Sequence, residues 1–141
     1  MRIVLDNNVF ISGIFWHGSP HKIIELVEKS VVKLCVSDEI LNELFGVLQR
    51  KKFDYLFAEA FTNRDTIFQK ILSLVTVYPL PKRTIAVKTS LADPKDKMFI
   101  PCALIAKAKY IVSGDKHLLN LKEFRGIPIL TANQFLNALR K

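Results

Sequence analysis

Short apolar runs alternate along the chain with longer segments in which apolar residues recur every three or four positions. The strand-sized runs are residues 2–5, 33–36, 74–78, 110–114 and 128–130. The intervening segments have the spacing of helices that bury one face. Strands and helices in alternation predict right-handed crossovers and a parallel sheet between helices. We therefore expect an α/β fold with a mostly parallel sheet of five strands.

Capping residues place most of the helix starts. The first strand is expected to lead into a loop that reaches Gly18, after which Ser19 and Pro20 fit the N-cap and first position of a helix. Ser37 predicts the cap of a second helix, and Thr131 predicts the cap of a terminal helix that ends at Leu139. Between them, residues 53–61 and 65–74 have helical patterns.

A further helix is expected to open at Asp93 and Pro94 and to continue through Ala106. Pro101 would fall in its third turn, where the ring removes a backbone donor. This position predicts a kink or break between Lys97 and Pro101.

The length and composition bound the class of protein. A chain of 141 residues with 50% hydrophobic residues fits one domain over residues 1–141. No apolar run approaches the roughly 20 residues of a membrane span, and the N-terminus lacks the features of a signal peptide. Cys35 and Cys102 stand in apolar patterns and are expected to be reduced core thiols. We therefore expect a cytoplasmic protein without a membrane partner.

The charge indicates a polyanionic partner. The chain has 21 Lys and Arg against 13 Asp and Glu, a net charge of +8. Clusters at residues 50–52, 82–83, 95–97 and 107–109 suit RNA. A solvated basic face without a ligand explains the composition equally well. The first turn contains no glycine-rich loop, which excludes a dinucleotide-binding site.

Four acidic residues stand where strands end or helices begin: Asp6, Glu43, Asp96 and Asp115. The carboxyl ends of parallel strands face one crevice, so acids placed there can converge although they are distant in sequence. Clustered carboxylates suit Mg²⁺ or Mn²⁺, which prefer hard oxygen ligands. A metal so held would activate water for phosphodiester hydrolysis.

Each acid also has an ordinary structural interpretation. Asp6 could begin an Asx-turn, and Asp115 follows a glycine in a common turn context. Glu43 lies on the rim of a helix face and could point outward. Asp93 and Asp96 both stand in a first helical turn, where capping suffices to explain them. We assign capping to Asp93 and metal contact to Asp96.

These segments together resemble the PIN domain family. The resemblance lies in the segment LDNNVFIS at 5–12, LNEL at 41–44, DPKDKMF at 93–99 and YIVSGDKHLL at 110–119. The chain is most similar to PIN proteins of the VapC-like toxin type. The resemblance implies a three-layer α/β/α sandwich with a five-stranded sheet and a Mg²⁺- or Mn²⁺-dependent ribonuclease. It also implies Asp6, Glu43, Asp96 and Asp115 as ligands, Asn8 and Ser113 in support, and an antitoxin as partner.

Two positions depart from the family pattern, and one alternative function stays open. Asn7 stands where the family usually has Thr, and Pro101 could displace Asp96. The alternative is a PIN-like module that binds RNA or a protein without cleavage. Phe53, Phe57 and Phe61 recur at helical spacing, which is more typical of core. Any exposed part of this stripe is a candidate contact for a homodimer or an antitoxin helix.

Overall fold

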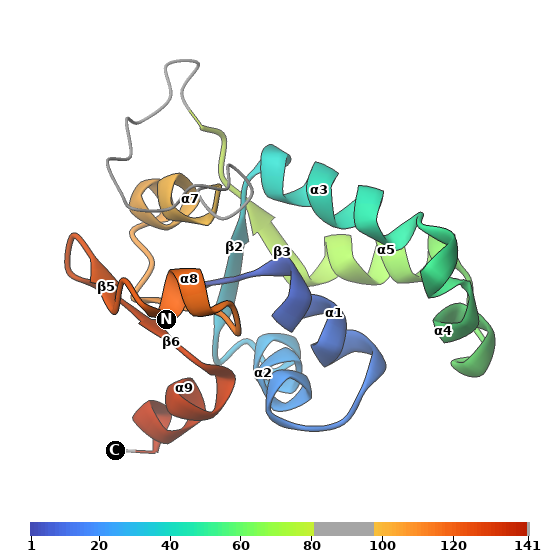
Figure 1. The fold of residues 1–141 in the computed structure, drawn as a ribbon, viewed down its shortest axis with the longest axis horizontal. Coiled ribbons are helices and arrows are strands. Elements are labelled where there is room, and N and C mark those ends of the chain that lie inside the picture. Colours follow the sequence, from blue (N-terminus) through green and yellow to red (C-terminus); the bar gives the residue numbers. More distant parts are fainter. Residues whose placement is uncertain (81–97, 141) are drawn as a thin grey trace.

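The strands of the fold form one mixed sheet. The computed structural model describes residues 1–80 and 98–140 (Figure 1). Within this part the strand order is β3-β2-β1-β4-β6-β5, with β5 alone antiparallel to its neighbour. The strands are β1 (Arg2–Leu5), β2 (Lys33–Val36), β3 (Val75–Val77), β4 (Tyr110–Val112), β5 (Glu123–Phe124) and β6 (Ile127–Leu130). The expected mostly parallel sheet is confirmed.

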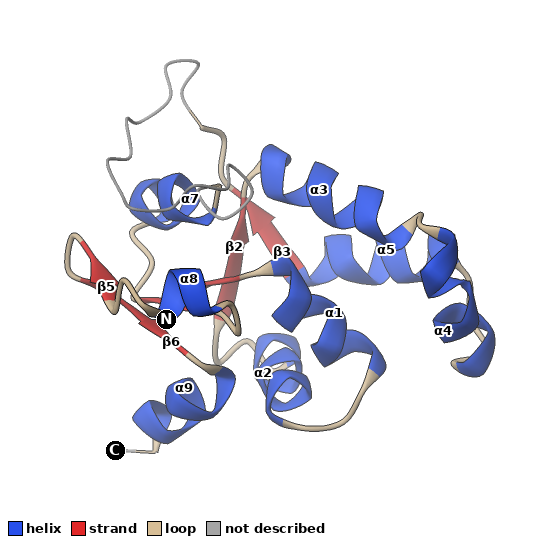
Figure 2. Cartoon of the chain, viewed as in Figure 1, coloured by secondary structure: helices blue, strands red, loops and turns tan. Residues whose placement is uncertain are grey.

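Helices cover the sheet on both faces, as a three-layer α/β/α sandwich requires (Figure 2). Helix α7 packs on the central strands β1, β2 and β4, while α1, α2 and α9 lie on the opposite side. The described helices are α1 (Asn7–Phe15), α2 (Ser19–Glu28), α3 (Asp38–Leu48), η1 (Lys51–Phe53), α4 (Asp54–Glu59), α5 (Arg64–Leu74), α7 (Phe99–Ala106), α8 (Lys116–Leu119) and α9 (Ala132–Leu139).

Strand β5 is one more strand than the sequence predicted. It pairs with β6 through a two-residue turn in which Arg125 and Gly126 have φ angles of 47° and 83°. Two successive left-handed residues form the turn that matches the twist of a hairpin. Arginine is an uncommon residue at such a position, so the turn and its two-residue strand were not visible in the sequence.

Helix α1 replaces the loop that was expected between the first strand and Gly18. Asp6 caps this helix, since its Oδ1 accepts a hydrogen bond of 2.8 Å from the Val9 amide. Gly13 allows α1 to approach α2, because a Cβ atom there would lie 2.7 Å from Ile24 Cγ1 and 2.8 Å from the Pro20 carbonyl oxygen. The expectation was wrong because α1 is apolar around most of its circumference and shows no amphipathic period.

The other caps follow the sequence closely. Ser37 accepts from the Ile40 amide, and Thr131 forms a reciprocal capping box with Gln134. Gly18 occupies the N-cap of α2, so Ser19 lies one position later than expected.

Pro101 occupies the third position of α7, not a third turn. A first-turn amide has no intrahelical acceptor, so proline needs no kink within α7. The preceding part of the predicted break, from Lys97, lies outside the described residues, as does the helix start at Asp93.

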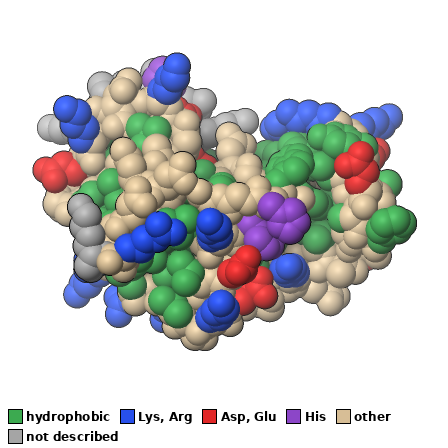
Figure 3. All heavy atoms as spheres, turned by 90° about the horizontal axis from the view of Figure 1, so that it is seen from below, with side chains coloured by type: hydrophobic (Ala, Val, Ile, Leu, Met, Phe, Trp, Pro, Cys, Tyr) green, Lys and Arg blue, Asp and Glu red, His purple; other side chains and the backbone are tan. Residues whose placement is uncertain are grey.

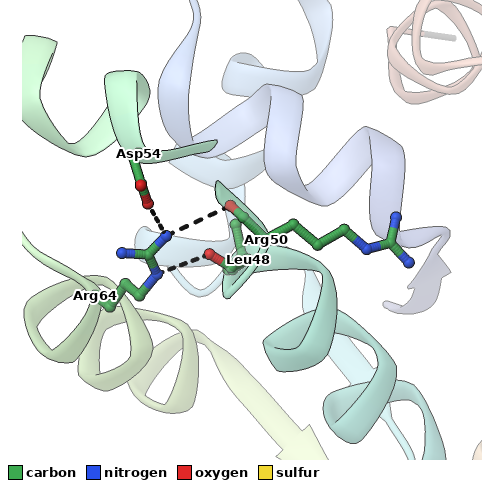
Figure 4. A network of polar contacts seen from close by, with 4 residues as sticks. All are labelled: Leu48, Arg50, Asp54 and Arg64. Carbon is green, nitrogen blue, oxygen red and sulfur yellow. Dashed lines mark hydrogen bonds and ion pairs between the residues drawn. The ribbon is translucent and has the colours of Figure 1, made fainter. Parts of the chain in front are cut away.

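The loop that follows α3 is fixed by Arg64 (Figure 4). Its Nε donates 3.0 Å to the Leu48 carbonyl, and its Nη2 donates to the Arg50 carbonyl and to Asp54. The same guanidinium lies 4.7 Å from the Phe57 ring centroid. One side chain thus joins the C-terminal end of α3 to α4 and to the start of α5, at the end of these helices away from β3 (Figure 1).

The core agrees with the predicted thiol state. Cys35 and Cys102 are buried and unbonded to each other, and burial raises the pKa of Cys102 to about 12. Such thiols stay protonated and unreactive. Within residues 1–80 and 98–140, the helices are too short or too polar to cross a membrane.

Candidate active site

Asp6 lies at the carboxyl end of β1 and is 4% exposed. Both of its carboxylate oxygens are in use. Oδ1 caps α1, while Oδ2 accepts from the Ser113 hydroxyl and, at 3.2 Å, from the Gly114 amide. These contacts orient the carboxylate toward the end of β4, the strand adjacent to β1.

Asp115 lies just beyond the end of β4, in the turn that leads into α8. Its amide donates 2.9 Å to Ser113 Oγ, and its Oδ1 caps α8 by accepting 2.7 Å from the His117 amide. The fully buried Ser113 hydroxyl donates to Asp6 and accepts from the Asp115 amide, so it bridges the two residues. The structure thus brings Asp6, Ser113 and Asp115 together at the ends of two neighbouring strands.

Burial dominates the electrostatics of Asp6. It raises the pKa of the carboxyl above its ordinary value, and the nearby Asp115 carboxylate raises it further, against the opposing effect of the three hydrogen bonds. Desolvation and a like charge both disfavour the ionised form. A cation beside these two carboxylates would remove that penalty, so this donor set fits a hard divalent metal.

A pocket of about 370 Å³ opens beside these residues. Its wall is built from the N-terminal ends of helices α1, α2 and α9 and from the turn after β4: Asn8, Val9, Ser12, Pro20, Ser113, Gly114, Asp115, Thr131 and Ala132. Helix N-termini carry partial positive charge and favour anions such as phosphate. The pocket therefore combines acidic oxygens with surroundings suited to a phosphodiester.

Glu43 is half-buried on α3. The buried Asn7 side chain donates 3.3 Å to the carbonyl of Ile40, which links the start of α1 to the first turn of α3. Glu43 follows Ile40 by three residues on the same helix. Glu43 therefore lies one turn beyond the point at which α3 is bonded to the start of α1.

The remaining predicted acids, Asp93 and Asp96, lie outside the described residues. Within residues 1–80 and 98–140, no three His, Cys, Asp or Glu side chains form a group that could hold a metal ion. Of the predicted ligands, the described structure thus joins Asp6 with Asp115 and places Glu43 at the neighbouring helix.

Two contributors to the site were not predicted as such. The Gly114 amide is a donor to Asp6, and Thr131 lines the pocket in addition to capping α9. The signal for both was topological. Gly114 follows β4 and Thr131 follows β6, and these two strands are parallel neighbours that end at the same edge of the sheet.

The phenylalanine stripe divides between core and surface. Phe57 is buried, Phe53 is half-buried, and Phe61 is 97% exposed.

A second cavity, of about 420 Å³, lies between α2 and α9 and contains none of the predicted site residues. Figure 3 shows the molecule from the side of these two helices, with hydrophobic side chains flanked by Lys and Arg.

Comparison with known proteins assigns the family. A family model described as PIN domain matches residues 2–117. A comparison with curated proteins finds no match. Among solved structures, the chain is similar to the crystal structure of VapBC2 from Rickettsia felis bound to a DNA fragment from their promoter. The TM-score is 0.59 at 17% identity, over 92% of this chain and 97% of that chain.

The chain belongs to the PIN domain family, because the family model spans most of its length. The solved structure, at its low identity, supports the fold alone. PIN domains are generally nucleases, and those nucleases usually use divalent metals. The α/β fold expected from the sequence is therefore confirmed together with its family.

Proposed function

We propose that this protein is a Mg²⁺- or Mn²⁺-dependent endoribonuclease that hydrolyses RNA phosphodiester bonds. The observation that carries the proposal is the buried Asp6 carboxylate, joined through Ser113 to the turn that holds Asp115, beside a pocket walled by helix N-termini. Carboxylates gathered at one edge destabilise a fold unless a cation joins them. This arrangement thus favours a metal nuclease over a module that only binds.

In this proposal Asp6 and Asp115 hold the metal together with Glu43 and Asp96. A bound Mg²⁺ or Mn²⁺ activates a water and stabilises the charge that develops on the phosphodiester. Ser113 fixes the orientation of the Asp6 carboxylate by donating to Oδ2. Asn8 is exposed on the pocket wall, where its amide can contact substrate. Asp93 and Asp96 lie outside the described residues, and in this proposal Asp93 would keep the capping role that the sequence predicts for it.

The surrounding surface suits RNA as substrate. The net charge of +8 includes the acids of the site, so the remaining surface is more positive than the total indicates. Lysine and arginine contacts to phosphates position a strand without specifying its sequence. The chemistry of the site and the charge of the surface therefore point to the same polyanionic substrate.

We further propose that the enzyme is the toxin of a toxin–antitoxin pair and acts in the cytoplasm as one domain. The similarity to the fold of the VapBC2 structure supports the pairing. The exposed Phe61, on a loop at the end of α4, offers an apolar contact for an antitoxin helix or for a homodimer.

The proposal is tested by cleavage of a mixed RNA pool with Mn²⁺, with Mg²⁺ and with EDTA. We expect wild type to cut only with metal and Asp6→Asn to lose at least a hundredfold in rate, because one carboxylate charge is removed at nearly constant size. Asp65→Asn, at an exposed position on α5, is the matched control and should cut like wild type.

Other outcomes separate the alternatives. Binding of RNA by wild type and Asp6→Asn without cleavage by either would instead support a non-cleaving PIN-like module. Cleavage that persists in EDTA would contradict the metal site.

A further inference from the structure

Asn7 is a buried polar side chain whose hydrogen bonding is incomplete. It is 7% exposed, and its Nδ2 donates 3.3 Å to the Ile40 carbonyl. Its Oδ1 is buried without a hydrogen-bond partner, the one such side-chain atom found in residues 1–80 and 98–140. Exchange of the two amide atoms would bring Oδ1 against a carbonyl oxygen, so the assigned orientation is the favourable one.

The hydrogen bonding of Asn7 is not expected to stabilise the fold. An unsatisfied buried polar group typically costs more free energy of folding than one neutral hydrogen bond contributes. The first position of a helix does not require an asparagine, since Asp6 already provides the cap of α1. The energetics of folding alone therefore do not explain a buried amide at this position.

The bond from Asn7 instead has a geometric effect. It joins residues 33 positions apart in sequence, the first residue of α1 and the first turn of α3. One end is covalently next to Asp6, and the other is one turn before Glu43. The Ser37 cap is local to α3, whereas the Asn7 bond links the first turn of α3 to the end of β1.

We propose that Asn7 is a positioning residue of the metal site, which sets the separation between Glu43 and Asp6. The inference rests on the proposed function, because it assumes that both carboxylates hold one metal site. A carboxylate displaced by a fraction of an ångström weakens a metal site, and loss of an outer residue typically costs 10–100-fold in metal affinity.

The test measures Mn²⁺ affinity without substrate, by electron paramagnetic resonance of the free ion, and the unfolding free energy in EDTA. We expect Asn7→Ala to bind Mn²⁺ about tenfold more weakly. In EDTA its unfolding free energy should be equal to or higher than that of wild type, because the unsatisfied carbonyl is removed. A purely structural role would lower both quantities together.

Two further variants complete the design. Asn7→Leu has the same branching at Cγ without hydrogen-bonding atoms, so a loss of affinity shared with Asn7→Ala cannot come from an empty space. Asn137→Ala, at an exposed position on α9, is the matched control and should bind Mn²⁺ like wild type.

The outcomes are distinguishable from failure of the proposed function. Mn²⁺ affinity within twofold of wild type in both Asn7 variants overturns the positioning role and leaves the metal site intact. Parallel loss of affinity and of stability in EDTA overturns it in favour of a structural role. If wild type and Asp6→Asn bind Mn²⁺ equally weakly, the metal site itself is refuted, and the role of Asn7 with it.

Discussion

Asp6 places opposing demands on folding and on the proposed chemistry. The carboxylate is buried beside a second acid, and yet it must be ionised to hold a cation. Its hydrogen bonds to Val9, Ser113 and Gly114 stabilise the charged form only in part, since burial still raises its pKa. The protonation state of the Asp6 carboxyl therefore links the stability of the fold to pH and, under the proposed function, to metal binding.

This coupling predicts a pH dependence of stability. The raised pKa of folded Asp6 means that the native state binds its proton more tightly than the unfolded chain. The contribution of Asp6 to stability is thus fully present below the unfolded pKa of about 3.9, and it is lost as pH rises through the folded pKa. In EDTA, the unfolding free energy of wild type relative to Asp6→Asn should fall as pH rises from that value.

Urea unfolding of both proteins across this range measures the difference, and Asp6→Asn serves as the reference because asparagine does not titrate. Saturating Mn²⁺ should remove the decline, because the metal binds the ionised carboxylate. A difference that stays constant with pH in EDTA would show that folding does not perturb the acid.

At the scale of elements, the end of α4 has an unusual residue. Phe61 has a φ of 52° and follows the helix, with its amide donating to the Ala58 carbonyl and the Thr62 amide donating to the Phe57 carbonyl. Glycine is the common residue at such a left-handed position after a helix. A phenylalanine that is 97% exposed gains little there from packing.

We therefore expect Phe61→Gly to raise the unfolding free energy by about 1 kcal/mol, because the backbone strain is relieved. Phe61→Ala keeps the strained backbone and serves as the control, with little change expected. Thermal unfolding of wild type, Phe61→Gly and Phe61→Ala tests this expectation. RNA cleavage should be the same in all three. A lower stability for Phe61→Gly would mean that the phenylalanine ring packs on the protein in solution.

Elements also differ in how well the sequence reveals them. Helices α3 and α9 have a recognisable capping residue, so their starts were predicted. Helix α1 packs against α2 and α3, and most of its residues are buried and most are apolar. The sequence therefore shows no alternation of apolar and polar residues at helical spacing in α1. Asp6, which caps this helix, was recognised as a candidate site residue but not as a cap.

At the scale of the molecule, parallel topology is what made the site predictable. Strands β1 and β4 are neighbours, so acids that follow them must lie near each other, and Asp6 and Asp115 do. The interactions within the site could not be foreseen in the same way. The Asn7 bond to Ile40 depends on how closely α1 approaches α3, a distance set by packing rather than by the local pattern.

The charge of the whole molecule leads to a last prediction, for RNA binding by the non-cleaving Asp6→Asn variant. The net charge of +8 is large for 141 residues, and phosphate contacts release counterions. For a single strand, log Kd should rise with log salt at a slope of about 0.7 for each phosphate neutralised. Four contacts would weaken binding by about 50-fold between roughly 50 and 200 mM salt.

Fluorescence anisotropy with a labelled oligonucleotide measures this slope. The double variant Lys51→Gln/Lys52→Gln should lower it if the exposed cations of η1 contact the strand, whereas Lys70→Gln on α5 tests for a general effect of net charge. Equal slopes in all three proteins would place the contacts elsewhere on the surface. Binding that is indifferent to salt would instead mean that the basic residues are only solvated, and that recognition depends on the pocket beside Asp6.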